Sequence, residues 1–447
     1  MNPIVKPHPV PLALALFGWT LVGCNDPQIC VGDCEGESES EGASDGVSLE
    51  ELRTCNVPTT ADRSQCGDGV AQPGELCFHD PVIIALGADP HGTAVGDFDG
   101  DGTADVSWST ESGALHLRLG DAVDPLGADV EWPSPVDVGT ALTSAGTGDL
   151  DGDGFVDVVT VSDSGQIDLM RGDGAGGFLE GDIVLVDPQL SWGPQLIDDD
   201  RDGDLDLSVI IAGARQNRIT LLNDGSGTFT ATARYDEPGA VYHPRTVAHV
   251  DDFVVGDHLH ARENRIYLWR QLPDFAASMN MQMELPFLRT LDIEVVDFDD
   301  NGFTDLLLLA VDDEARVEID GQPLAVYTSL RVFEGLDLGA IYGVGWGRET
   351  TLPLDCGGSD MAVADLDGDG AVDTVSSHHA VLDQSASLVV RLGGGAEPFE
   401  SVVRVPAPAG IDTGGPVRIG DFDGDGLADV VTAHRNDDAL VLYRGRR

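Results

Sequence analysis

Six short segments share a spacing of carboxylates around one glycine that suits them to hold a metal ion. In the last of them, Asp421-Phe422-Asp423-Gly424-Asp425-Gly426-Leu427-Ala428-Asp429, acidic side chains occupy positions 1, 3, 5 and 9. A sharp turn at position 6 directs these side chains and the carbonyl of position 7 to one point, and glycine can adopt the left-handed conformation that this turn needs. Oxygen ligands in this number are typical of a calcium site.

We call these segments acidic loops and name each by its first residue. Without a cation each loop holds three or four like charges within a few ångströms, so cation binding and local folding should be coupled. The sequence predicts about six calcium ions, each of which fastens a turn, and leaves open whether any ion keeps a position free for a ligand. The expected ligands, side chains except for the carbonyl at position 7, are Asp97, Asp99, Asp101, Thr103 and Asp105; Asp149, Asp151, Asp153, Phe155 and Asp157; Asp198, Asp200, Asp202, Asp204 and Asp206; Asp297, Asp299, Asn301, Phe303 and Asp305; Asp365, Asp367, Asp369, Ala371 and Asp373; and Asp421, Asp423, Asp425, Leu427 and Asp429.

Helix-flanked calcium loops of the EF-hand or dockerin kind begin with a similar acidic pattern. They also need a bidentate carboxylate at position 12, and none of the six loops has one there. The segments that follow the loops are rich in β-branched residues, as in 157–161 and 429–432, which favours strands over helices. We therefore expect each loop to join two strands.

The acidic loops mark a repeat of about fifty residues. They begin at residues 97, 149, 198, 297, 365 and 421, and one interval is double. In its middle, Val250–Gly256 keeps the first acid and the glycine but has Phe253 and Val255 where ligands should be, so we interpret it as a seventh repeat without a metal. Four short strands in such a period are typical of a β-propeller blade. The expected fold is all-β, a seven-bladed propeller over residues 81–447, in which Pro81–Leu86 supplies the outer strand of the last blade.

With these acidic loops and strands, the repeats resemble the FG-GAP or VCBS repeats of integrin-α-like propellers. Six of the seven repeats carry the motif in full, and the resemblance spans 81–447. It implies calcium in the blade loops and a role in adhesion or recognition, but it names no ligand.

The N-terminal part of the chain reads as an export signal and a tether. An apolar run from Val10 to Val22 is too short to span a bilayer comfortably, which favours a signal peptide over residues 1–23. Leu21-Val22-Gly23-Cys24 resembles a bacterial lipobox, which implies lipidation of Cys24 and a membrane-anchored lipoprotein at the bacterial cell envelope or surface; ordinary secretion with a plain thiol is the alternative. Residues 24–65 are rich in Ser, Gly and Glu, which predicts a disordered acidic tether.

Seven cysteines occur in the chain, and assigning Cys24 to a lipid leaves six that can all pair in an exported protein. The sequence does not choose among the fifteen connectivities of six cysteines. Residues 66–80 form a short Cys-rich clip that resembles a repeat of myxobacterial surface proteins. This resemblance implies a disulfide between Cys66 and Cys77, although Phe78-His79 stands where an acidic pair usually follows.

The formal net charge of −55 excludes nucleic acid as a main partner. Catalytic signals are weak: Gly42–Gly46 matches a hydrolase pattern inside the tether, Gly172–Gly177 matches a dinucleotide fingerprint but reads as a hairpin turn, and the pairs His258/His260 and His378/His379 lack a third ligand. We expect a surface recognition or adhesion module with an extracellular protein or glycan ligand. The alternatives are an enzyme, a lyase or hydrolase, acting on extracellular polysaccharide with its site on the propeller face, and a passive envelope scaffold.

Two places are candidates for binding a partner: the fifth repeat, whose loops break the regularity of the repeats, and Trp192. The fifth repeat carries the acidic insertion Val311–Leu324 and, further on, Tyr342–Gly347. Trp192 offers a ring that could stack on a sugar, but a tryptophan between strands is more often part of a blade core.

Overall fold

The structure is a computed structural model that describes residues 76–446, except for 88–89, 111–113, 128, 134–141, 163, 180, 212–215, 233–234, 238–244, 249–254, 263–264, 272–277, 286–287, 313–315, 320–321, 326–327, 338–343, 381–385, 395–398 and 412–413. The signal peptide, Cys24, the tether and Cys66 lie outside the described residues, and so do Gly42–Gly46. Among the described residues, no helix has the length and apolar character needed to cross a membrane.

The described chain is all-β apart from one short 3-10 helix, Arg435–Asp437 (η3). Its strands form seven sheets of four or five strands, which confirms the repeated four-stranded sheets typical of a propeller, and one two-stranded hairpin. Sheet 1 holds β2 (Thr93–Gly96), β3 (Asp105–Ser109), β4 (Ala114–Arg118) and β5 (Asp129–Pro133); sheet 2 holds β6 (Leu142–Gly148), β7 (Asp157–Ser162), β8 (Gln166–Met170) and β9 (Asp182–Val186); sheet 3 holds β10 (Leu190–Ile197), β11 (Asp206–Ile211), β12 (Gln216–Asn223), β13 (Phe229–Ala231) and β14 (Tyr235–Glu237). Sheet 4 holds β15 (Arg245–Ala248), β16 (Val255–Arg262), β17 (Arg265–Gln271) and β18 (Ser278–Glu284); sheet 5 holds β19 (Leu288–Val296), β20 (Asp305–Asp312), β23 (Thr328–Asp337) and β24 (Val344–Pro353); sheet 6 holds β25 (Gly358–Ala364), β26 (Asp373–His378), β27 (Ser387–Leu392) and β28 (Ser401–Pro406); sheet 7 holds β29 (Val417–Gly420), β30 (Asp429–His434), β31 (Ala439–Tyr443) and β1 (Val82–Ala85). The hairpin β21 (Arg316–Ile319) and β22 (Gln322–Ala325) falls in the acidic insertion of the fifth repeat.

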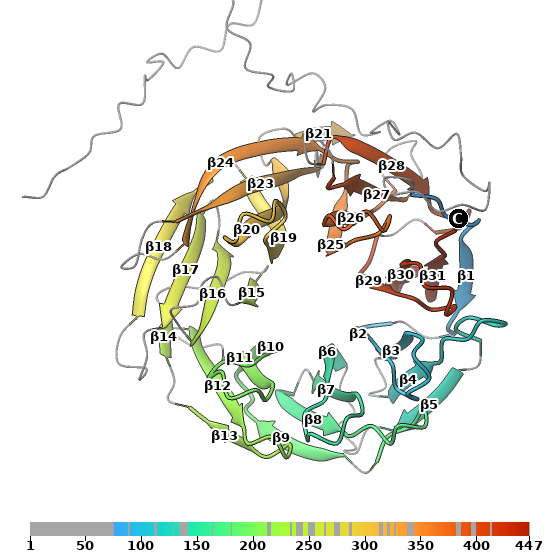
Figure 1. Cartoon of the computed structure of the whole chain (residues 1–447), viewed down its shortest axis with the longest axis vertical. Coiled ribbons are helices and arrows are strands. Elements are labelled where there is room, and N and C mark those ends of the chain that lie inside the picture. The colour runs from blue at the N-terminus through green and yellow to red at the C-terminus, as the bar shows by residue number, and fades with distance from the viewer. Residues whose placement is uncertain are drawn as a thin grey trace, which may run out of the picture. The chain divides into compact units, whose positions relative to one another are not determined.

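Neighbouring strands within each sheet are antiparallel, and the sheets follow one another around a ring (Figure 1). The first strand of every sheet lies innermost and beside the first strand of the next, in the order β2, β6, β10, β15, β19, β25 and β29. Because β29 also lies beside β2, the circle of inner strands is closed. The six acidic loops, each between a first and a second strand, therefore lie on the same face of the ring.

The last sheet is completed by the start of the described chain, as the sequence predicts. Strand β1 pairs with β31 in a register that joins Val82 to Leu442 and Ala85 to Ala439. The amide of Leu86 donates a hydrogen bond of 2.9 Å to the carbonyl of Asp438. This pairing joins the two ends of the repeat region within one sheet.

Removing this strand should disrupt the ring. We expect deletion of Val82–Leu86 to broaden thermal unfolding and lower the melting temperature, because sheet 7 then loses its outer strand and the link between its two chain segments. Differential scanning calorimetry measures both effects. The matched control replaces the hairpin β21–β22, which pairs with none of the seven sheets, by a short Gly-Ser linker. A deleted protein that melts as sharply and as hot as the parent would contradict this closure.

The core lies between neighbouring sheets, so second strands are buried along their whole length, polar residues included. Every residue of β7, β26 and β30 is buried, because each of these strands is covered on both faces. Between sheets 2 and 3, for example, Val159 and Leu169 pack with Leu207 and Leu221. The β-branched residues of the repeats fit these pleated, two-sided contacts.

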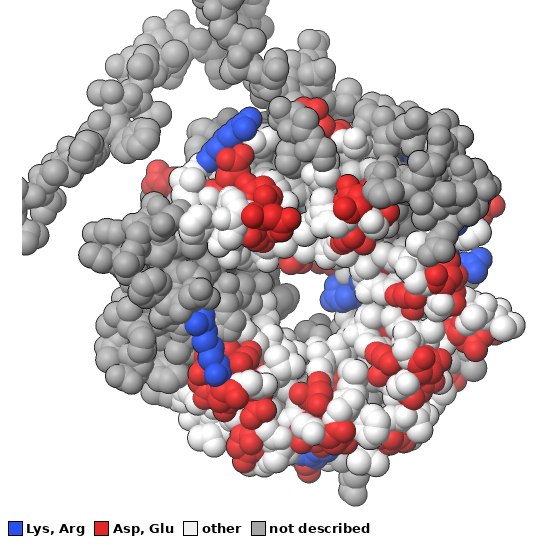
Figure 2. Space-filling model, in the orientation of Figure 1, with Lys and Arg blue, Asp and Glu red and all other residues white. Residues whose placement is uncertain are grey.

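Inner strands of neighbouring sheets are also joined by polar contacts. Oδ2 of Asp292 in β19 accepts the amide of Met361 in β25 at 3.0 Å, and Oδ2 of Asp360 accepts the amide of Val417 in β29 at 2.7 Å. The guanidinium of Arg418 then donates to the carbonyl of Thr93 in β2 at 3.0 Å. These bonds tie sheets 5, 6, 7 and 1 together at the middle of the ring, where Figure 2 shows a hollow with both acidic and basic atoms on its wall.

Sheet 4 is the repeat that the sequence reads as lacking a metal, and its four strands confirm that it is a structural unit. In the six repeats with an acidic loop, eight residues separate the first strand from the second, as from Gly96 to Asp105. In sheet 4 only six separate Ala248 from Val255. The second strand thus starts earlier where the ligands are missing.

Candidate metal centres in the acidic loops

In the acidic loops, carboxylate oxygens cluster between the end of the first strand and the start of the second. In five loops, three carboxylates each place one oxygen within 4.8 Å of the others. In four of these loops the three come from positions 1, 3 and 9, and in the Asp97 loop they come from positions 1, 3 and 5. The groups are Asp97, Asp99 and Asp101; Asp149, Asp151 and Asp157; Asp198, Asp200 and Asp206; Asp297, Asp299 and Asp305; and Asp365, Asp367 and Asp373.

The backbone of each loop turns as the glycine pattern predicts. All six glycines at position 6 have a positive φ, from 81° at Gly426 to 102° at Gly203. Position 4 also has a positive φ in every loop, including two residues that are not glycine, Arg201 at 62° and Asp300 at 56°. A side chain in this region is strained, so the turn is imposed on these two residues by the rest of the loop.

Hydrogen bonds from the loop backbone hold the side chains at positions 1 and 5. In all six loops the amide of the position 6 glycine donates to Oδ2 of the first aspartate, as from Gly102 to Asp97 at 3.0 Å. In all six the amide of position 7 donates to Oδ1 of position 5, as from Thr103 to Asp101 at 2.8 Å. These bonds prearrange the loop without an ion.

The aspartate at position 9 has a second role that sequence reasoning missed. Its side chain is fully buried in all six loops and accepts two backbone hydrogen bonds. For Asp157, Oδ2 accepts the amide of Leu150 at position 2 at 2.8 Å, and Oδ1 accepts the amide of Gly172, in the turn after the third strand, at 2.9 Å. The other five follow the same rule, with turn amides from Gly120, Asn223, Gly335, Gly393 and Gly445.

Burial raises the pKa of these six carboxyls although two amides stabilise each negative charge. The pKa is raised to about 6 for Asp105, Asp157, Asp206 and Asp305, and to about 7 for Asp373 and Asp429. Desolvation is the largest cause, and the other carboxylates of the same loop add repulsion. Each loop thus concentrates negative charge that the protein around it does not fully neutralise.

Three of the loops also contact the next sheet through the carbonyl of position 2. The carbonyl of Phe98 accepts the amide of Gly176 at 3.2 Å, and that of Leu150 accepts Nδ2 of Asn223 at 2.8 Å. The carbonyl of Phe422 in sheet 7 accepts the amide of Asp121 in sheet 1 at 3.1 Å. These three acidic loops are therefore junctions between neighbouring sheets, and their conformation affects the packing of one sheet on the next.

The remaining candidate residues form no exposed catalytic set among those that the structure describes. Gly172–Gly177 is a hairpin turn, closed by the amide of Asp173 on the carbonyl of Gly177 at 3.0 Å. Nε2 of His378 lies 2.8 Å from Oγ of Ser376, but both side chains are buried, and burial lowers the pKa of His378 to about 4. Trp346 packs partly buried on the core of sheets 4 and 5. The side chains of Trp192, His258 and His260 lie outside the described residues.

Both Cys77 and Cys356 are buried and disulfide-bonded. The expected partner of Cys77, Cys66, lies outside the described residues, so that pairing stays a prediction. The bonded state of Cys356 agrees with the expectation that cysteines other than Cys24 can pair.

A family model described as an FG-GAP-like repeat matches residues 149–209 and 365–432. The chain contains FG-GAP-like repeats. The two matches begin at the first aspartates of the Asp149 and Asp365 loops and extend into the second strands β11 and β30. No curated protein matches the chain in sequence.

Solved structures support the fold around these FG-GAP-like repeats. Two crystal structures of BBS1N in complex with ARL6DN, soaked with mercury and with lead, align with TM-scores of 0.54 and 0.51 at 10% identity; each alignment covers 83% of this chain and 97% of the other. Sqt1 of Saccharomyces cerevisiae aligns with a TM-score of 0.48 at 9% identity, over 84% of this chain and 99% of Sqt1. At such low identity the two BBS1N alignments show the fold alone.

Proposed function

We propose that this protein is an exported, lipid-anchored, calcium-binding β-propeller with seven blades that acts as a recognition or adhesion module at the bacterial cell surface. One observation carries the proposal: five acidic loops each bring three carboxylate oxygens within 4.8 Å, and the sixth repeats their hydrogen-bond pattern. The seven sheets are the proposed blades, and the resemblance of residues 21–24 to a lipobox supports the anchor at Cys24.

The residues of the loops fit calcium. Their donors are hard oxygens, which Ca²⁺ prefers, and positions 1, 3, 5 and 9 with the carbonyl of position 7 supply the required number. In the Asp421 loop, Oδ1 of Asp423 is buried and has no hydrogen-bond partner. A buried carboxylate oxygen in that state is costly, and a bound cation would satisfy it. The bound ions would neutralise the loops and fix the junctions between blades.

Recognition, the second part of the proposal, is supported by the charge of the loop face. Figure 2 shows acidic clusters at intervals around this face of the ring. The chain has a net charge of −55, and six divalent ions would leave it strongly acidic. A protein ligand would thus present a basic surface, and a glycan would be bound through hydroxyl groups near the ions. One structural neighbour, BBS1N, was crystallised in complex with ARL6DN, which supports a protein partner for this fold.

Two measurements on the mature exported protein test the proposal. Elemental analysis after dialysis against a buffer that contains trace calcium should find about six calcium ions per chain. An array of extracellular glycans and matrix proteins, probed with and without a chelator, should show binding that needs calcium, while the same glycans incubated with the protein should remain intact. Cleavage of a glycan would favour a polysaccharide-active enzyme instead, if that cleavage is lost when Asp or Glu residues on other loops of the propeller face are substituted.

A further inference from the structure

We propose that the residue just before the turn amide that binds position 9 sets the calcium affinity of each acidic loop, and that arginine there makes two of the six sites weak. This inference rests on the proposed function. The six equivalent residues are identified by the shared hydrogen bond from the following residue to Oδ1 of position 9. They are Leu119, Arg171, Leu222, Glu334, Leu392 and Arg444.

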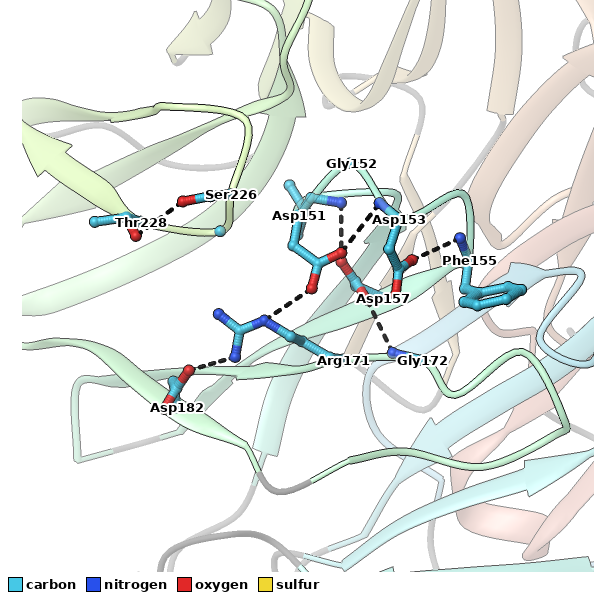
Figure 3. A network of polar contacts seen from close by, with 12 residues as sticks. Asp151, Gly152, Asp153, Phe155, Asp157, Arg171, Gly172, Asp182, Ser226 and Thr228 are labelled. Atoms are coloured by element: carbon cyan, nitrogen blue, oxygen red, sulfur yellow. Dashed lines mark hydrogen bonds and ion pairs between the residues drawn. The ribbon is translucent and has the colours of Figure 1, made fainter.

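In the Asp149 loop, Arg171 is a built-in counter-ion for the aspartate at position 3. Its Nε lies 3.0 Å from Oδ2 of Asp151, and its Nη1 pairs with Asp182 in β9 (Figure 3). The side chains of Arg171 and Asp151 are 20% and 15% exposed, so this pair is largely shielded from solvent. Asp151 belongs to the group of three carboxylates that would hold the ion. A positive charge therefore already sits on one ligand of this loop.

The Asp421 loop has the same arrangement. Nη1 of Arg444 lies 3.5 Å from Oδ2 of Asp423, the aspartate at position 3, and Asp423 is 12% exposed. This arginine is held less tightly than Arg171, because no second carboxylate is paired with it among the described contacts. The orphaned Oδ1 of Asp423 leaves this loop with a ligand atom free for the cation.

Leucine occupies the same place in the Asp97 loop, as a glycine of the following sheet shows. In the Asp149 loop this glycine is Gly227 of sheet 3, which lies against both Arg171 and Asp151: a methyl group added to it would lie 2.9 Å from Nη2 of Arg171 and 3.3 Å from Cβ of Asp151. The same addition to Gly176, one sheet earlier, would lie 3.0 Å from Cδ1 of Leu119 and 3.5 Å from Cβ of Asp99. Leu119 therefore stands beside its position 3 aspartate as Arg171 does, but without a charge.

The charge of this residue should change calcium affinity because, in the two arginine loops, it lies 3.0 to 3.5 Å from a carboxylate that would hold the ion. An arginine repels a divalent cation and occupies a carboxylate that the cation needs, whereas leucine does neither. Glu334, at the equivalent position of the Asp297 loop, is paired with Arg348, whose Nη1 lies 3.7 Å from its Oε1, so its charge is partly compensated. We therefore expect two weak sites, in the Asp149 and Asp421 loops, and four tighter ones.

Calcium titration calorimetry of the full mature chain tests the inference, with Arg171→Leu, Arg444→Leu and Leu119→Arg as variants. The parent should show two sites about tenfold weaker than the rest, the expected size of the effect of one nearby charge. Each arginine variant should convert one weak site to a tighter one, and Leu119→Arg should create a third weak site. Leu119→Arg is the reciprocal control, since it transfers the proposed determinant to another loop.

The possible outcomes separate this inference from the proposed function. Six bound ions whose affinities are unchanged in all three variants would overturn the inference and leave calcium binding intact. A parent chain that binds no calcium would overturn the proposed function itself. Circular dichroism of each variant with saturating calcium checks that the sheets are retained, and a variant that misfolds is replaced by Arg171→Gln or Arg444→Gln, for which the same shift is expected.

Discussion

Chelation of calcium should lower the melting temperature of this protein by roughly 20 °C. A site held at a hundredfold excess of ligand over its dissociation constant stabilises the folded state by about 2.7 kcal/mol, so six sites contribute about 16 kcal/mol. At about 2 cal/mol/K of unfolding entropy per residue, that free energy corresponds to a shift of this size for the propeller. The loops join neighbouring sheets through Phe98, Leu150 and Phe422, so the loss should spread through the ring.

Scanning calorimetry with calcium and with an excess of chelator measures this shift, and magnesium at the same concentration is the control. Magnesium demands a smaller octahedral site and should recover little of the loss. Equal melting temperatures in all three conditions would contradict calcium binding in the loops.

Lowering the pH should reduce the difference in melting temperature between the calcium-loaded and the chelated protein. The pKa of the buried aspartate at position 9, such as Asp157 or Asp429, is raised to about 6 or 7, above the value of about 4 in the unfolded chain. The metal-free folded state therefore binds more protons than the unfolded state between pH 4 and 7, and it loses stability as pH rises through that window. Lowering the pH from 7.5 to 5 should raise the melting temperature in chelator and weaken calcium binding.

The all-β repeats could be predicted from the sequence because they depend on local patterns. Acidic loops at regular spacing, β-branched runs after them and a leftover strand at Pro81–Leu86 identify the sheets and the pairing of β1 with β31. Even sheet 4 could be recognised without its ligands, since Asp251, Gly256 and the run Arg265–Leu268 keep their order in the sequence of the repeat, although the structure places Gly256 inside β16. Each of these signals lies within a few residues of the feature that it specifies.

Other features depend on contacts between distant residues, which no spacing rule in the sequence specifies. The position 9 aspartates were predicted as ligands alone, because the turn amides that bind them lie 15 to 30 residues away. The pairing of Arg171 with Asp151 joins the third strand to the loop and likewise has no spacing rule. One sequence feature does mark the place: Gly or Asn stands at or near the end of the third strand in the six repeats with an acidic loop, where the amide approaches the carboxylate.

The two roles of position 9 can be separated by substitution, with Asp157→Ala compared to Asp153→Ala. Both variants remove one carboxylate from the Asp149 loop. Asp157 is fully buried and accepts the amides of Leu150 and Gly172, whereas Asp153 is exposed and accepts only the amide of Phe155. Asp157→Ala leaves two buried amides without acceptors, each of which costs about 1 to 3 kcal/mol.

In chelator, we therefore expect Asp157→Ala to lower the free energy of unfolding by about 2 to 5 kcal/mol and Asp153→Ala to change it by less than about 1 kcal/mol. With calcium, both variants should lose the ion of the Asp149 loop and bind five. Urea denaturation in chelator and calcium titration supply the two numbers for each variant. Equal destabilisation by both variants without calcium would show that the buried aspartate acts through its charge alone. If Asp157→Ala alone destabilises the metal-free protein, the hydrogen bonds hold the loop in place before the ion arrives, and the same two bonds in the other five loops act in the same way.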